Sequence, residues 1–462
     1  MTAPPAPAGL AGLLRRLGGG GLLARAARGA GWTALGFGGG QALRLASNLV
    51  LARLLFPEAF GLMALVSVFL TGLAMFSDVG IGPSIMQSRR GEDPAFLDTA
   101  WTMQIMRGAL LWLASWAAAG PAARFYDAPM LAQLLPAAGL TLLIAGFNPT
   151  RIELAQRRLT LGRVMAADLG AQLAGAAAMI ALALATRSVW ALVLGALVAA
   201  AAKLALSHLM LPGPRNRLRW ESAAARELIG FGKWIFLSSA LGFVVAQGDR
   251  AILGRFLTLD MLGIYNIGYF LASAPMMLAG AVVSRIMIPV YRDSPPAADP
   301  RNFARLRRLR FALSGAAMAL IALMAFAGPA LVDLLYDARY HAAGAIVTAA
   351  ALAQMVQALG MTYDQSALAA GDSRSYFWLF AARATFQTAF ILLGATHGGL
   401  LGALIGQGLA FAASHPLIAL LARKHGAWDP LHDAVFALGG MALGAGALWH
   451  AREALGALSG VG

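Results

Sequence analysis

The chain has 462 residues, of which 59% are hydrophobic and only 12% are charged. Because an ordinary soluble domain has roughly 25% charged residues, this composition predicts a polytopic membrane protein. The chain has no cysteine, which excludes disulfides and thiolate metal sites. We attribute the net charge of +15 to basic cytoplasmic loops and expect no nucleic-acid partner, since no nucleic-acid-binding motif accompanies it.

Residues 1–30 are predicted to form a cytoplasmic N-terminal leader, because glycines and four arginines interrupt any apolar core of the kind that a secretory signal needs. Twelve apolar stretches follow, each near the roughly 20 residues that a helix needs to cross a bilayer. They lie near 31–55, 60–86, 99–120, 130–150, 162–185, 188–210, 231–255, 262–290, 309–333, 342–365, 376–396 and 399–422. A thirteenth stretch, near 431–450, is shorter and rich in Gly and Ala.

An internal repeat divides these stretches into two sets of six. "LARLLFPEAFGL" at 51–62 matches "LGRFLTLDMLGI" at 253–264 at one constant offset, with an arginine, an acid and a glycine in step. We therefore expect an all-α integral membrane protein with two six-helix bundles around a central cavity. The predicted parts are an N-terminal lobe (31–211), a cytoplasmic linker with an amphipathic helix (212–230), a C-terminal lobe (231–424) and a tail with the thirteenth helix (425–462).

Basic residues predict the orientation. If the N-terminus is cytoplasmic, most arginines fall in loops on that side, and the opposite loops hold only Arg124, Arg187 and Arg339. Both halves then start on the same side, so the repeat is parallel. The linker and the segment "PTRIELAQRRLTLGR" (149–163) are predicted to be interfacial helices with arginines toward anionic headgroups, and we favour anchoring over substrate recruitment as their role.

Polar side chains recur inside the predicted spans, although a charge at the membrane centre costs about 2.5–3.5 kcal/mol on insertion scales. Spacings of three or four residues form stripes on helix faces, which we expect to turn toward a shared water-filled cavity. The candidate cavity residues are Gln41, Arg44, Asn48, Arg107, Lys203, Gln247, Arg250 and Arg383. The candidates for coupling or gating are Asp78, Asp168, Asp249 and Asp364.

Several of these residues have a plainer interpretation. Asp78 precedes "VGIGPS" and could mark a hinge, a proton site or only a helix end. Asp249 could pair with a basic residue on another helix. A local ion pair at the turn is favoured for Arg53 beside Glu58, and likewise in the second copy of the repeat.

The deep charges are mostly positive and are accompanied by amides. This combination suits a large anion that bears hydroxyls, such as a sugar chain on a phosphate or pyrophosphate, because the guanidinium fork matches phosphate oxygens. We expect no catalytic site, metal or cofactor, apart from a coupling ion, H⁺ or Na⁺. The loops are short and hold no paired carboxylates, so an enzyme is not predicted.

Three segments, "FGKWIFLSSALGFVVAQGDRAILGRFLTLDMLGIYNIGYFLASAP", "DVGIGPSIMQ" and "NPTRIELAQRRL", resemble landmarks of bacterial Wzx-type polysaccharide-transport flippases. That family belongs to the multidrug/oligosaccharidyl-lipid/polysaccharide superfamily, and the resemblance runs from about residue 31 to 424. It implies two lobes that form a V around a cavity in the bacterial inner membrane.

The resemblance further implies translocation of an undecaprenyl-pyrophosphate-linked oligosaccharide (a repeat unit of O-antigen, capsule or exopolysaccharide) to the outer leaflet by ion-coupled alternating access. Arg44 and Arg250 are the positions that would bind pyrophosphate. Membrane lipids, a glycan polymerase and chain-length or export machinery are the expected partners. The alternatives are a multidrug or small-solute antiporter of the same superfamily and a membrane glycan polymerase.

Overall fold

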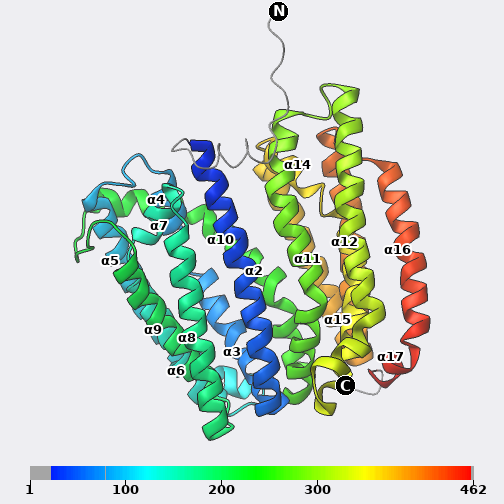
Figure 1. The fold of residues 1–462 in the computed structure, drawn as a ribbon, viewed down its shortest axis with the longest axis horizontal. Helices are drawn as coiled ribbons and strands as arrows, with labels where there is room; N and C mark the ends of the chain where they lie inside the picture. Colours follow the sequence, from blue (N-terminus) through cyan, green and yellow to red (C-terminus); the bar gives the residue numbers. More distant parts are fainter. Residues whose placement is uncertain (1–21, 79, 459–462) are drawn as a thin grey trace, which may run out of the picture. The chain divides into compact units, whose positions relative to one another are not determined.

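The computed structural model describes residues 22–78 and 80–458, and within them the secondary structure is helical throughout (Figure 1). Most of the predicted leader lies outside the described residues, and its end, from Leu22 on, already belongs to the first helix. The long helices of the first half are α2 (Leu22–Leu54), α3 (Pro57–Met75), α5 (Pro94–Phe125), α6 (Leu131–Gly146), α8 (Gly162–Thr186) and α9 (Trp190–Met210). Two short helices, α4 (Ile81–Gln87) and α7 (Arg151–Arg157), lie in the connections.

The second half is built in the same way. Its helices are α10 (Ser222–Phe256), α11 (Leu259–Asp293), α12 (Pro300–Leu335), η1 (Ala338–Tyr340), α13 (His341–Gly360), α14 (Asp364–Ala369), α15 (Ser373–Lys424), α16 (Pro430–His450) and α17 (Arg452–Leu458). The backbone of α15 is not helical at Gly398 and Gly399. α15 is therefore two helices, and the break falls at the predicted boundary between the eleventh and twelfth stretches.

Most of the thirteen apolar stretches coincide with a single long helix, but 60–86 ends as α3 at Met75 and resumes as α4, and 342–365 is divided between α13 and α14. The protein is a multi-span helical membrane protein. In the described part of the chain, eight helices are long and apolar enough to cross a bilayer, or nine if α6 and α7, bent by 60°, form one broken span. The thirteenth stretch is among them, as α16. The stretches on α2, α5 and α10 are of spanning length but carry more polar residues, so the arrangement of six plus six spans stays a prediction.

The helices cluster into two compact units. The first comprises the described residues up to Leu54, Leu73–Ala123 and Pro129–Leu237, and the second comprises Leu55–Gly72, Arg124–Ala128 and the described residues from Ser238 on. Most of α3 thus packs with helices of the second half. The predicted limits of the lobes stay predictions.

In the first unit, α8 and α9 form an antiparallel hairpin, with α2 against α8 and α6 against α9. Gly175 and Gly195 face each other in the hairpin, where an added Cβ on either would collide with the opposite helix. Small residues at such contacts let helix backbones approach closely in a membrane. In the second unit, α13 is the core helix. About 72% of its apolar segment is buried, against 11% for α16, which lies at the edge beside α12 (Figure 1).

The two copies of the repeat meet inside the second unit, where the start of α3 crosses the start of α11. A Cβ on Gly61 would overlap with the carbonyl oxygen of Leu259, and a Cβ on Gly263 would overlap with that of Pro57. These four positions correspond pairwise in the repeat, so the contact is reciprocal. Asp260 adds to it, because its Oδ1 accepts a hydrogen bond of 3.1 Å from the backbone N–H of Glu58. Asp260, in the second copy, thus contacts the backbone of Glu58 in the first copy, whereas the sequence predicted only a pairing within each copy.

Two of the four arginines of segment 149–163, Arg151 and Arg157, differ from the prediction that this segment directs its basic side chains to lipid headgroups. Arg151 is 9% exposed and donates hydrogen bonds to the carbonyls of His208, Leu211 and Pro214, just where α9 ends. Arg157 donates to the carbonyls of Ile85 and Ser88 at the end of α4. Both guanidiniums satisfy the free carbonyls of helix C-termini, where a cation is favoured.

Candidate functional site

A buried polar cluster joins α10 to α11 and α15 in the second unit. Asp249 is 4% exposed, and its Oδ2 accepts a 2.7 Å hydrogen bond from the hydroxyl of Tyr265. The basic group nearest to it is its own neighbour Arg250, with Nη1 4.0 Å from Oδ1. Asp249 therefore receives its support from a tyrosine on α11, where the sequence suggested a basic residue on another helix.

Arg250 has its neighbour's carboxylate 4.0 Å away, and its hydrogen bonds are all to neutral groups. Its Nε donates to Asn266 Oδ1 at 2.9 Å and its Nη1 donates to Gln247 Oε1 at 3.4 Å. The guanidinium also lies 5.6 Å from the centre of the Tyr269 ring, whose hydroxyl accepts a 3.0 Å hydrogen bond from Gln407. The side chain keeps 18% of its surface exposed. This arrangement leaves a cation that is oriented by neutral groups and can still accept an anion.

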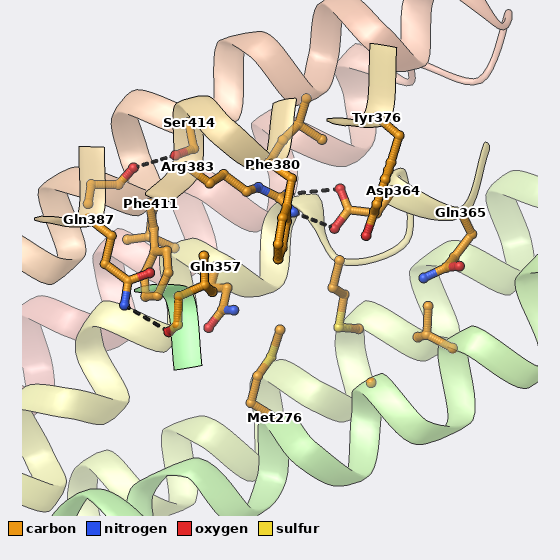
Figure 2. Close-up of a pocket in the computed structure, with 17 residues that line it drawn as sticks. Met276, Gln357, Asp364, Gln365, Tyr376, Phe380, Arg383, Gln387, Phe411 and Ser414 are labelled. Atoms are coloured by element: carbon orange, nitrogen blue, oxygen red, sulfur yellow. Dashed lines mark hydrogen bonds and ion pairs between the residues drawn. The ribbon is translucent and has the colours of Figure 1, made fainter. Parts of the chain in front are cut away.

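A cavity of about 270 Å³ lies in the same unit, between α10, α11, α13, α14 and α15 (Figure 2). Arg383 and Asp364 face each other across one wall in a fork of two hydrogen bonds, both 2.8 Å (Figure 2). Gln387 donates from Nε2 to the carbonyl of Val245 at 3.1 Å. The other polar groups of the lining are Gln357, Gln365, Tyr376 and Ser414.

The chemistry of this cavity is neutral and amphipathic. The charge of Arg383 is balanced by Asp364, and the rings of Tyr376 and Phe380 lie stacked at 6.2 Å with an angle of 11° between them. Amide groups with flat aromatic faces suit a hydroxyl-bearing ligand with apolar faces, such as a sugar ring. Because Arg383 is paired with Asp364, the lining of this cavity has no unpaired cation that could bind a phosphate.

The predicted residues of the first unit form separate groups. Lys203 Nζ lies 2.9 Å from Asp168 Oδ1, which joins α9 to α8. Arg107 donates to Ser77 Oγ at 3.0 Å and to the Ala74 carbonyl at 2.6 Å, where α3 ends. Lys203 and Arg107 thus each connect two helices.

The remaining predicted site residues are Asp78 and the polar residues of α2. Asp78 Oδ1 accepts a 2.9 Å hydrogen bond from the N–H of Gly80, whose φ of 62° only glycine adopts without strain, so this acid shapes the turn before α4. On α2, Arg44 is exposed, and Gln41 and Asn48 are half-buried. The structure brings together Gln247, Asp249 and Arg250, Asp364 with Arg383, and Asp168 with Lys203. The convergence of all of them on one cavity stays a prediction.

Sequence reasoning missed the residues that organise the site of the second unit. Tyr265, Tyr269 and Tyr376 count as apolar in a hydropathy pattern, and Gln407 stands alone in its stretch. A signal was present in "YNIGY", because tyrosines four residues apart lie on one helix face beside an asparagine. Within the described residues, no group of three or more His, Asp or Glu side chains could hold a metal ion.

These features define a class, a helical membrane protein with polar groups sequestered inside its bundles, and solved structures share its fold. The lipid II flippase MurJ in an inward closed conformation superimposes with a TM-score of 0.68 at 10% identity, over 91% of this chain and 98% of that one. An inward-facing multidrug resistance MATE family transporter of the MOP superfamily gives 0.61 at 14% identity, over 83% of this chain and 96% of that one.

Comparison of sequences gives the family. The family model described as polysaccharide biosynthesis protein matches residues 50–345, and the chain belongs to this family. The succinoglycan biosynthesis transport protein ExoT of Rhizobium meliloti is 23% identical over 379 residues, 82% of this chain and 76% of that protein. The lipopolysaccharide biosynthesis protein WzxC of Escherichia coli is 24% identical over 264 residues, 57% of this chain and 54% of that protein. The resemblance stated from the sequence motifs is confirmed.

Proposed function

We propose that the protein is a flippase for lipid-linked oligosaccharide in the bacterial inner membrane. The observation that carries the proposal is the amphipathic cavity of the second unit. Its amides and aromatic rings can bind a hydroxyl-bearing cargo within the membrane. Family membership supports the same function, since relatives are named as transport proteins of polysaccharide biosynthesis. This makes the protein a transporter, not an enzyme.

The substrate we propose is an undecaprenyl-pyrophosphate-linked repeat unit that crosses from the cytoplasmic to the outer leaflet by alternating access. Arg250 suits the pyrophosphate because its hydrogen bonds are to neutral groups and the nearest carboxylate, Asp249, lies 4.0 Å away, beyond hydrogen-bonding distance. Arg44, which is exposed on α2, is the second proposed contact. A glycan polymerase and chain-length or export machinery are the proposed protein partners.

We also propose coupling to an H⁺ or Na⁺ gradient, with Asp249 as the first candidate. Asp249 is buried, and a tyrosine hydroxyl and the neighbouring arginine support its charge. Binding or release of a cation there would change the charge beside Arg250 directly. Collapse of one gradient at a time in membrane vesicles, with flipping measured, identifies the ion.

The central test replaces Arg44 and Arg250 together with Ala in a strain that depends on this protein. We expect export of the glycan to fall at least tenfold, with the lipid-linked precursor accumulating on the inner leaflet. Arg292→Ala is the matched control, because that side chain is 74% exposed at the end of α11. Unchanged export at normal protein levels would remove both arginines from the mechanism. Normal glycan export with altered drug tolerance in a deletion strain would favour the antiporter.

A further inference from the structure

An apolar groove of about 390 Å³ opens on the first unit, where α5 begins and α6 and α9 end. It is lined by Trp101 from α5, Phe147 after α6, and Ala201, Leu204, Ala205 and His208 from α9. The indole of Trp101 donates a 3.3 Å hydrogen bond to the carbonyl of Phe147, which fixes one wall. Five of the six lining residues are apolar, so the groove suits a hydrocarbon chain.

The connection from α9 to α10 starts beside this groove, just after the lining residue His208. Its start is held by Arg151, which bonds the carbonyls of His208, Leu211 and Pro214. Farther along, the N–H groups of Arg217 and Arg219 donate to Asp98 Oδ1 at 2.9 Å and to Thr102 Oγ1 at 3.1 Å. Because His208 lines the groove and Thr102 is the neighbour of the lining residue Trp101, the connection passes near the groove at both of these points.

This connection places a row of cations near the groove. Arg215, Arg217 and Arg219 occupy alternate positions of a segment without helix or strand, and all three are exposed. Their guanidiniums have no hydrogen bond or ion pair with any residue that the structure describes. Leu218 and Trp220, in the same segment, are 72% and 52% exposed. Such a segment has the composition of a membrane interface, where tryptophan and arginine gather.

We propose that the groove and its arginine row form a binding site for an anionic phospholipid, with an acyl chain in the groove and the phosphate at the arginines. Charge complementarity selects this occupant, because three exposed arginines lie on the connection that passes near an otherwise apolar groove. Basic pockets beside membrane helices bind anionic headgroups in this way. The backbone of the connection is tied to α5 and α7, so the cations are held in place. The proposal does not depend on the flippase function.

The test uses the full chain, purified in detergent and stripped of lipid, with binding followed by native mass spectrometry. The probes are phosphatidylglycerol and phosphatidylcholine with the same acyl chains. We expect the wild type to bind phosphatidylglycerol at least tenfold more tightly. The triple variant Arg215→Gln/Arg217→Gln/Arg219→Gln should lose this preference, because each arginine removed is expected to weaken the binding of phosphatidylglycerol about fivefold. Ala205→Trp, which fills the groove, should weaken the binding of both lipids.

The matched control is Arg292→Gln/Arg301→Gln/Arg305→Gln, three exposed arginines around the start of α12, which should bind like the wild type. Equal binding by the wild type and the arginine-row variant, or an equal loss in the control, would overturn the proposal. A second measurement needs no variant. Phosphatidylglycerol with a photoreactive acyl chain should label peptides that contain residues 201–208 or Trp101, and labelling confined to other helices would also overturn it.

Discussion

Two arginines of the second unit, Arg250 and Arg383, looked equivalent in the sequence, yet the structure gives them opposite surroundings. Arg383 is neutralised by Asp364 through two hydrogen bonds of 2.8 Å. Arg250 is oriented by Asn266 and lies over Tyr269, with its nearest carboxylate oxygen 4.0 Å away. Arg383 is hydrogen-bonded to its carboxylate and forms part of a cavity wall, whereas Arg250 has its carboxylate beyond hydrogen-bonding distance and can donate to an anionic ligand. Counting intramembrane cations therefore overstates how many of them can bind an anion.

The largest expected effect comes from breaking the paired site. Asp364→Asn leaves the guanidinium of Arg383, which is only 21% exposed, without its counter-ion. Removing one partner of a buried pair costs about 3 kcal/mol of unfolding free energy or more. We expect a clear loss of thermal stability in detergent. The double variant Asp364→Asn/Arg383→Gln should recover part of it, and no recovery would show that the pair is not the cause.

A smaller loss is expected at the buried acid beside Arg250. Tyr265→Phe removes one hydrogen bond to the charged carboxylate of Asp249 and keeps the ring. Hydrogen bonds to charged groups contribute about 1.5–3 kcal/mol, and we expect the lower end because Arg250 remains beside the acid. Chemical denaturation of the purified protein measures the loss, with Tyr376→Phe at the cavity as the matched control. A loss as large as that of Asp364→Asn would contradict the distinction between the two regions.

Arg250→Gln should also cost less stability than Asp364→Asn, about 1–2 kcal/mol, because Asp249 loses the cation 4.0 Å away but keeps the hydrogen bond from Tyr265. Export of the glycan should nevertheless fall at least tenfold, whereas Arg383→Gln should act mainly through stability. Thermal stability and export measured on the same two variants separate these effects. Normal export by a stable Arg250→Gln protein would place the anion site elsewhere.

The smallest effect is expected at an exposed pair outside the spanning segments, where α15 begins. The ammonium of Lys424, 2.6 Å from Asp372 Oδ2, and the N–H of Ser375 hold the pKa of Asp372 well below its usual range. A depressed carboxyl pKa contributes stability at neutral pH that is lost as the pH falls below about 4.

Thermal midpoints of the wild type and Asp372→Asn should therefore differ at pH 7, and the difference should begin to shrink as the pH falls below about 4, without vanishing at pH 3 because the pKa of Asp372 in the folded protein lies lower still. A difference that persists unchanged at the acidic end would exclude the carboxylate as its source.

Hydropathy predicted much of the fold, because the length of an apolar stretch is fixed by the bilayer. The stretches on α8 and α9 and the break near Gly398 were located in this way. The partners of the polar residues could not be predicted, because pairing depends on the rotation of each helix about its own axis. Arg151 and Arg157 illustrate this point, since a basic pattern does not distinguish a headgroup contact from the carbonyls of a neighbouring helix end. The tyrosines were missed because their rings are apolar and only their hydroxyls reach Asp249 and Gln407.

The crossing of α3 and α11 has an evolutionary consequence. Gly61 approaches the carbonyl of Leu259, and Gly263 approaches the carbonyl of Pro57, which is the relation that a two-fold symmetric homodimer has across its axis. A six-helix ancestor with this self-complementary surface would already have been able to associate with its own copy before gene fusion. After fusion each copy could diverge separately. The hydrogen bond from the backbone N–H of Glu58 to the side chain of Asp260 shows that the two copies now contribute differently to the contact.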